Sequence, residues 1–63
     1  MVYTIREIQN FGKLIKLSDG SQWEVSVMDS GKSANWSLGD EVDTGFSELT
    51  HVKRKETVAA RKK

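Results

Sequence analysis

The residues with the clearest chemical signal are six basic side chains near the end of the chain. Residues 51–63 carry one acidic residue and six basic ones, whereas residues 1–50 carry eight acidic and four basic side chains. The six are Lys53, Arg54, Lys55, Arg61, Lys62 and Lys63. Clusters of this kind either keep a chain in solution or contact phosphates and other acidic surfaces. Because the rest of the chain is acidic, binding of a nucleic acid or an acidic protein surface would have to use this segment.

A further candidate is Trp36, which lies between Asn35 and Ser37, where no alternation forces its ring inward. An aromatic side chain in such a loop either closes an open end of a hydrophobic core or lines an exposed groove that binds a ligand. We keep both interpretations and group Trp36 with the six basic residues as a candidate binding site. The sequence contains no recognition helix and no RNP-type aromatic pattern, so sequence-specific reading of bases is not predicted.

No arrangement of residues predicts catalysis. His51 is the only histidine and the chain has no cysteine, so we expect an ordinary strand histidine and no metal site. Gly31-Lys32-Ser33 resembles the end of a phosphate-binding loop, but Ser26 stands where that motif needs its first glycine. We interpret residues 31–33 as a polar turn, and we expect neither a cofactor nor enzymatic activity.

These observations favour a small non-enzymatic binding module. The first hypothesis is weak, sequence-independent binding of a nucleic acid or an acidic partner through the C-terminal basic segment. The alternative is a protein–protein adaptor that holds a peptide in a groove of the fold or along an exposed edge strand.

The element around which the rest must be arranged is a β-hairpin over residues 14–27. Trp23, Val25 and Val27 alternate with polar residues after the turn, and Ile15 and Leu17 share a face before it. The apolar sets of the two strands meet on one face only if the pairing register is right, because a slip of one residue turns a strand over.

The turn chemistry fixes this register. A three-residue loop at residues 18–20 pairs Ile15 with Trp23, and it also places Phe11 opposite Val27. A two-residue Asp19-Gly20 loop would instead place Lys16 opposite Trp23. We therefore predict the three-residue loop with a bulge, in which Gly20 adopts the left-handed conformation.

The remaining segments are predicted from local patterns. Strands are expected at residues 2–8, 41–46 and 49–53, with a turn at 9–12 and a bulge or strand end at Ile8, which breaks the alternation. Residues 28–40 are expected to form a loop with one helical turn near 34–36. Phe46 shares a face with Val42 and is expected in the core. Residues 54–63 fit either a helix or a short closing strand at 57–60.

Five short strands without a convincing helix predict an all-β barrel. An SH3-like barrel fits the length best, and a closing strand at 57–60 would make it six-stranded. The alternative is an OB-like barrel, in which residues 30–38 replace the short helix. We expect a single domain over residues 1–60 and a disordered basic tail at 61–63.

Length and composition limit what can hold this fold together. A chain of 63 residues without cysteine has a small core and no disulfide, so apolar packing must supply its stability. The absence of cysteine also fits a reducing compartment, and we expect a cytoplasmic protein. No apolar run is long enough to suggest a signal peptide or a membrane span.

Two stretches together resemble a pattern in small uncharacterised bacterial β-barrel proteins. They are residues 17–25, Leu-Ser-Asp-Gly-Ser-Gln-Trp-Glu-Val, and residues 36–42, Trp-Ser-Leu-Gly-Asp-Glu-Val. The pattern consists of a strand, Asp-Gly-Ser, Trp-Glu-Val, a loop and Trp-x-x-Gly-Asp-x-Val, and it covers roughly residues 5–60. The resemblance implies an SH3-like barrel fold and no particular activity, because the shared residues are turn and core residues.

Overall fold

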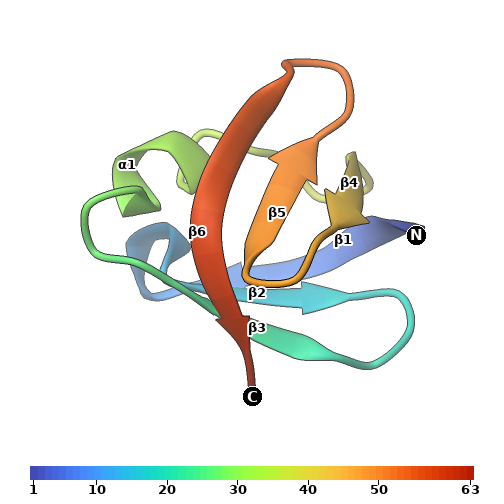
Figure 1. The fold of residues 1–63 in the computed structure, drawn as a ribbon, viewed down its shortest axis with the longest axis horizontal. Coiled ribbons are helices and arrows are strands. Elements are labelled where there is room, and N and C mark those ends of the chain that lie inside the picture. The colour runs from blue at the N-terminus through green and yellow to red at the C-terminus, as the bar shows by residue number, and fades with distance from the viewer.

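Six antiparallel strands form a closed barrel in the computed structural model, which describes all residues from 1 to 63 (Figure 1). The strands are β1 (Val2–Gln9), β2 (Leu14–Leu17), β3 (Gln22–Val25), β4 (Glu41–Thr44), β5 (Glu48–His51) and β6 (Glu56–Lys62). A 3₁₀ turn, η1 (Asn10–Gly12), joins β1 to β2, and a one-turn helix, α1 (Ser30–Ser33), lies between β3 and β4. No helix has the length and apolar character needed to cross a membrane.

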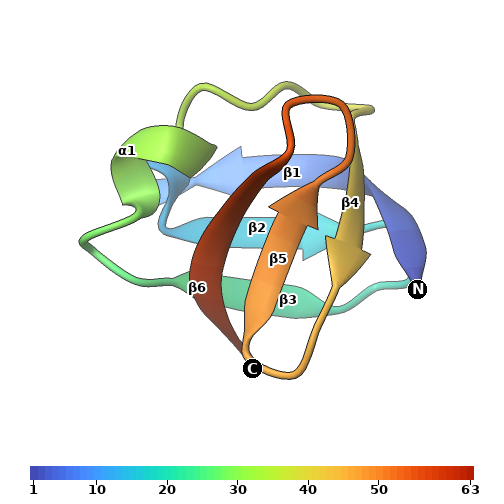
Figure 2. The same cartoon turned by 45° about the horizontal axis from the view of Figure 1, so that its top comes forward.

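The barrel consists of two three-stranded meanders, β1-β2-β3 and β4-β5-β6, which cross steeply in Figure 2. The pairs β1–β4 and β3–β6 join the two meanders, so every strand has a neighbour on both sides. The all-β prediction is confirmed, and the segment that was ambiguous between helix and strand forms the sixth strand. β6 continues to Lys62, beyond the domain boundary expected at residue 60, because Arg61 and Lys62 pair with β3.

The predicted register of the first hairpin is confirmed. Ile15 pairs with Trp23, and the loop is closed by a hydrogen bond from the Leu17 amide to the Ser21 carbonyl oxygen at 2.9 Å. Inside the loop, the Gly20 amide donates to the Leu17 carbonyl oxygen at 3.0 Å, and Gly20 has a φ of +89°. The three-residue loop with a left-handed glycine therefore holds both apolar sets on the inner face.

The prediction that Phe11 lies opposite Val27 is wrong. β3 ends at Val25, and Phe11 belongs to η1, where its φ of +58° interrupts the alternation before β2 begins. Both side chains are exposed. The alternation predicted for the hairpin therefore does not reach Phe11 or Val27, because backbone turns end it on both sides.

The prediction that Phe46 is buried is also wrong. Val42 faces the core, but β4 ends at Thr44, and the Gly45 amide donates to the Glu48 carbonyl oxygen at 2.9 Å to close a tight turn. Phe46 lies at the tip of this turn and is fully exposed. The core contains ten residues from all six strands and one loop: Ile5, Ile15, Leu17, Trp23, Val25, Trp36, Val42, Leu49, Val58 and Ala60.

Two local irregularities position the loops. The bulge or strand end expected at Ile8 does not occur there, because Ile8 pairs with Ile15 and β1 continues to Gln9. The β1–β2 register shifts earlier, between Ile5 and Glu7, which is a bulge. The helical turn forms at residues 30–33 and not near 34–36. Its position is held by Ser33, which is fully buried and donates from Oγ to the Gly12 carbonyl oxygen at 2.6 Å.

Candidate functional site

The first group of predicted basic residues lies in the turn between β5 and β6. Lys53, Arg54 and Lys55 are all exposed there, and Lys55 has a left-handed φ of +56°. Arg54 is partly used by the fold, because its Nη1 lies 3.8 Å from Oε1 of Glu56. The two lysines have no such ion pair and present their ammonium groups to solvent.

The second group lies at the other end of β6 (Figure 1). Arg61 pairs with Glu24 and Lys62 with Trp23 on β3, and the Lys63 amide donates to the Gln22 carbonyl oxygen at 2.8 Å. At about 3.3 Å per residue, the six residue steps from Lys55 to Arg61 span roughly 20 Å. The two basic groups therefore lie at opposite ends of one strand and do not form a single patch.

Strand pairing brings further basic side chains to the second group. Lys16 on β2 is the partner of Gln22, so Lys16, Gln22 and Lys63 form a row across the outer face of β2, β3 and β6. Lys13 lines the same surface hollow as Lys63. Sequence analysis missed both lysines as site residues because the pairing of β3 with β6 has no local signal. The predicted hairpin register did imply that the Lys16 side chain points outward.

Carboxylates lie among these basic side chains. Arg61 faces Glu24 across the β3–β6 pair, and Glu7 is the β1 partner of Lys16. The pKa of Asp19 is lowered, mainly by hydrogen bonds from the Ser21 side chain and amide and to a smaller extent by the charge of Lys62. The positive potential of this face is consequently moderated, and it suits weak rather than tight binding of an anion.

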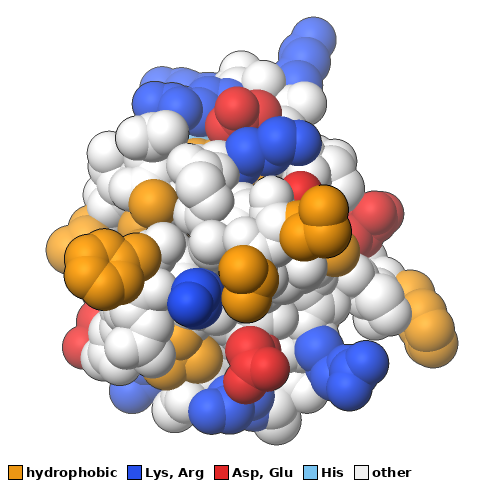
Figure 3. All heavy atoms as spheres, turned by 90° about the vertical axis from the view of Figure 1, so that its left-hand side faces the viewer, with side chains coloured by type: hydrophobic (Ala, Val, Ile, Leu, Met, Phe, Trp, Pro, Cys, Tyr) orange, Lys and Arg blue, Asp and Glu red, His pale blue; other side chains and the backbone are white.

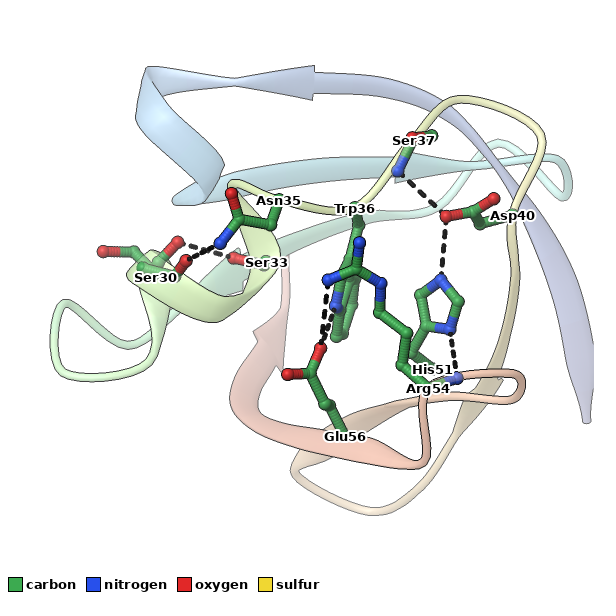
Figure 4. Close-up of polar contacts among 10 residues, drawn as sticks. Ser30, Ser33, Asn35, Trp36, Ser37, Asp40, His51, Arg54 and Glu56 are labelled. Atoms are coloured by element: carbon green, nitrogen blue, oxygen red, sulfur yellow. Dashed lines mark hydrogen bonds and ion pairs between the residues drawn. The ribbon is translucent and has the colours of Figure 1, made fainter.

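Trp36 is 4% exposed and belongs to the core. Its Nε1 donates to Oε1 of Glu56 at 3.0 Å, and its ring centroid lies 5.2 Å from that of His51 (Figure 4). This burial agrees with the interpretation in which Trp36 closes an end of the barrel. The interpretation in which Trp36 lines an exposed aromatic groove is wrong, because the buried ring of Trp36 is not available to stack on a base.

His51, whose ring lies beside Trp36, is also buried and is only 2% exposed. Its Nδ1 accepts the Arg54 amide hydrogen at 3.1 Å, so Nδ1 carries no proton and Nε2 donates to Oδ2 of Asp40 at 2.8 Å. Both ring nitrogens are thus engaged within the fold (Figure 4). His51 lies at the end of β5, as expected of a strand histidine, and its two ring nitrogens bond to Asp40 and Arg54.

Asp40 completes this network. Its Oδ2 also accepts the Ser37 amide hydrogen at 2.9 Å, and the hydrogen bonds from His51 and Ser37 lower the pKa of the Asp40 carboxyl. The ionised carboxylate therefore links the loop after α1 to β5. The network holds two parts of the barrel together.

Two other candidate sites have structural explanations. The structure contains no group of three or more His, Cys, Asp or Glu side chains that could hold a metal ion. Residues 31–33, the remnant of a phosphate-loop motif, lie in the four-residue helix α1, and the buried Ser33 hydroxyl is bonded to Gly12. The hydroxyl that would coordinate Mg²⁺ in such a motif is therefore used by the fold.

The exposed aromatic side chains are at positions that sequence analysis assigned to paired or buried sites. Phe11 and Phe46 are both almost completely exposed, each in a turn between two strands. Phe11 also lines a surface hollow of about 460 Å³ with Ile8, Ala34, Trp36 and Leu38. The turn predicted at residues 9–12 was the signal for the position of Phe11, and it is incompatible with the paired position expected for that side chain.

No protein family, curated protein or solved structure matches this chain. The assignment of function therefore depends on the chemistry of the surface alone.

Proposed function

We propose that this protein is a non-enzymatic binding module for a nucleic acid backbone, and that basic side chains at both ends of β6 make the contacts. The observation that carries this proposal is the position of these side chains: all six are exposed, and β6 holds them in two groups. At the C-terminal end, Lys13 and Lys16 add to the second group. A polyanion is the partner that can contact two separated groups of cations at the same time.

The binding should be weak and independent of sequence. Each basic group has a neighbouring carboxylate, Glu56 at one end and Glu24 at the other. Lysine and arginine side chains that contact phosphates release counterions, so affinity falls with salt. We expect a dissociation constant of about 10⁻⁴–10⁻⁶ M at physiological salt and a slope of log affinity against log salt of roughly −3 to −5.

The test is a titration of labelled single- and double-stranded oligonucleotides at several salt concentrations. The variant K53Q/R54Q/K55Q removes the first group and R61Q/K62Q/K63Q removes the second, and each should flatten the slope. The control R6Q/K32Q removes two exposed cations that lie outside both groups, and it should change the slope much less. Circular dichroism would establish that each variant keeps the fold.

Absence of binding at low salt would reject this function. Binding with an unchanged salt slope in both triple variants would equally reject it. Trp36→Ala is not a useful probe of base stacking, because the buried ring of Trp36 makes that variant a test of folding.

The second candidate is a peptide adaptor, favoured by the apolar hollow beside Phe11. The hollow is lined mainly by Ile8, Phe11, Ala34, Trp36 and Leu38, with Glu7 at its margin. A peptide seated there would bind with a shallow salt slope, which separates it from the first candidate. The edge-strand form of the adaptor has no template, because the closed barrel pairs every strand on both sides.

We also propose that the chain shares its barrel with the small bacterial proteins whose pattern it resembles. The residues of that pattern have structural roles here: Trp23 and Trp36 are buried, and Asp40 bonds Ser37 and His51. Such a relation concerns the fold and supplies no activity. A cytoplasmic location remains part of this proposal.

A further inference from the structure

Phe11 combines an unfavourable backbone with an exposed side chain. Asn10, Phe11 and Gly12 have φ values of +54°, +58° and +89°, so three successive residues are left-handed. For a bulky residue this conformation is rare and strained. Burial of the ring does not compensate for the strain, because Phe11 is 91% exposed.

The turn is held in place from its other side. The Gly12 carbonyl oxygen accepts a hydrogen bond from the buried Ser33 hydroxyl, and a Cβ added at Gly12 would come within 2.5 Å of the Ala34 amide nitrogen. The Gly12 backbone is therefore packed directly against α1. The contacts of Gly12 fix the position of η1, and the Phe11 ring lies in solvent.

Two basic side chains line a hollow beside η1. On one side of η1 is the apolar hollow that Phe11 lines with Ile8 and Leu38. A second hollow is lined by Asn10, Lys13 and Lys63, together with the carboxylate of Glu24 and the apolar side chains of Leu14, Val25 and Val27. Figure 3 views the molecule from the end where η1 and α1 lie; separate hydrophobic patches lie across its middle, with Lys and Arg above and below and Asp and Glu side chains among them. Apolar surface flanked by cations is complementary to a ligand with flat apolar rings and negative linkers.

We propose that Phe11 is a platform on which a base of a single-stranded nucleic acid stacks, while Lys13 and Lys63 contact phosphates beside that base. The inference rests on the proposed function and specifies its ligand. Stacking on an aromatic side chain accepts any base, because every base has a π face. A duplex cannot use the platform, because its bases are already stacked on one another.

The decisive variant is Phe11→Asn. Asparagine tolerates the left-handed conformation, so the variant should melt at a temperature equal to or higher than the parent. Its affinity for an oligothymidylate of about 12 nucleotides should fall roughly 5- to 150-fold, the effect of losing one stacked base. The salt slope should stay the same, because no phosphate contact is removed.

Three comparisons isolate stacking from other effects. Phe11→Trp should bind at least as tightly as the parent, because the indole keeps a stacking surface. Phe46→Asn removes an equally exposed phenyl ring from the β4–β5 turn and should leave affinity unchanged. An abasic oligomer of the same length should bind the parent and Phe11→Asn equally, since it retains the phosphates and lacks the bases.

Several results would overturn this assignment. If Phe11→Asn binds oligothymidylate as tightly as the parent while the salt slope persists, the platform is wrong and the proposed function stands. If the parent binds no nucleic acid at low salt, both are wrong. Equal affinity for single strands and duplex would also reject the stacking platform. So would binding of an apolar peptide that Phe11→Asn abolishes, if the parent binds no oligonucleotide.

Discussion

Gly12 and Gly20 show that one backbone conformation can serve two purposes. Both have a φ of +89°, but a Cβ at Gly20 would meet nothing within 4 Å, whereas at Gly12 it would meet the backbone of α1. Gly20 is needed for the conformation of its turn, and Gly12 is needed for both its turn and its packing.

Alanine substitutions should separate these two requirements. We expect Gly20→Ala to lower the free energy of unfolding by roughly 1 kcal/mol, the cost of a left-handed alanine. Gly12→Ala should cost about 1–3 kcal/mol more, because the added methyl group overlaps backbone atoms. Urea denaturation of both variants measures the difference. Equal losses would show that the contact between η1 and α1 can relax freely.

Asp40 should make stability depend on pH. Its pKa is lowered in the folded state from a reference of 3.8 by hydrogen bonds from His51 and Ser37, so the stabilisation is fully present above the unfolded pKa. It is lost as the pH falls through the folded pKa. Asp19 at the first hairpin has a pKa lowered in the same direction by Ser21.

The expected outcome is a fall in the urea midpoint as the pH drops below about 4. Asp40→Asn should reduce this dependence, and Asp40→Asn combined with Asp19→Asn should reduce it further. Glu41→Gln is the matched control, because Glu41 is an exposed carboxylate next to Asp40 whose side chain makes no hydrogen bond or ion pair in the fold, and it should leave the profile of the parent. A profile unchanged in the double variant would show that other carboxylates govern acid unfolding.

At the scale of secondary structure, the first hairpin was predictable because its information is local. Turn chemistry at residues 18–20 and the alternation around Trp23 specify the register without reference to other strands. The burial of Trp36 was not predictable in this way. Its hydrogen-bond partner Glu56 is 20 residues distant in sequence, and the ring is buried by the long-range assembly of the barrel.

The same distinction explains the errors in the candidate site. Phe11 and Phe46 fit the alternation of the neighbouring strands, but Phe11 lies three residues before β2 begins and Phe46 lies two residues after β4 ends. The row containing Lys16 and Lys63 needs the pairing of β3 with β6, which brings together segments far apart in the sequence. The sequence indicated which types of residue could form a site, but it did not indicate where the strands end or which distant strands pair.

Trp23 should dominate the stability of the hairpin. Its ring is buried, and its Nε1 donates at 3.0 Å to the Ser21 hydroxyl, which in turn donates at 2.6 Å to Asp19. We expect Trp23→Ala to cost about 3–5 kcal/mol. For a domain of this size that approaches the whole stability, so the variant should be largely unfolded.

Thermal melting followed by circular dichroism would measure this effect. Gln22→Ala is the matched control, because Gln22 is the neighbouring exposed residue on the outer face, and it should melt close to the parent. An unchanged melting temperature for Trp23→Ala would contradict the assignment of the inner face of β3.

At the scale of the whole molecule, the sequence predicted the class of fold better than its closure. Six strands could be arranged in open or closed sheets, and only the pairs β1–β4 and β3–β6 close this one. Closure also separates the basic groups, because β6 spans the barrel from the β5–β6 turn to the edge of β3. The basic residues near the end of the sequence therefore lie at two separate places on a body of 24 × 23 × 21 Å.

The two seams that close the barrel also bear on how fast it forms. The β1–β4 seam ends in an ion pair between the Met1 amino group and Asp43, which are 42 residues apart in sequence. Such distant contacts form only after a long loop has been closed, and its entropy opposes the first encounter. The chain should consequently fold in milliseconds to seconds, far more slowly than a helical bundle of equal length. The hairpins should form early, and the pairing of β1 with β4 and of β3 with β6 should limit the rate of folding.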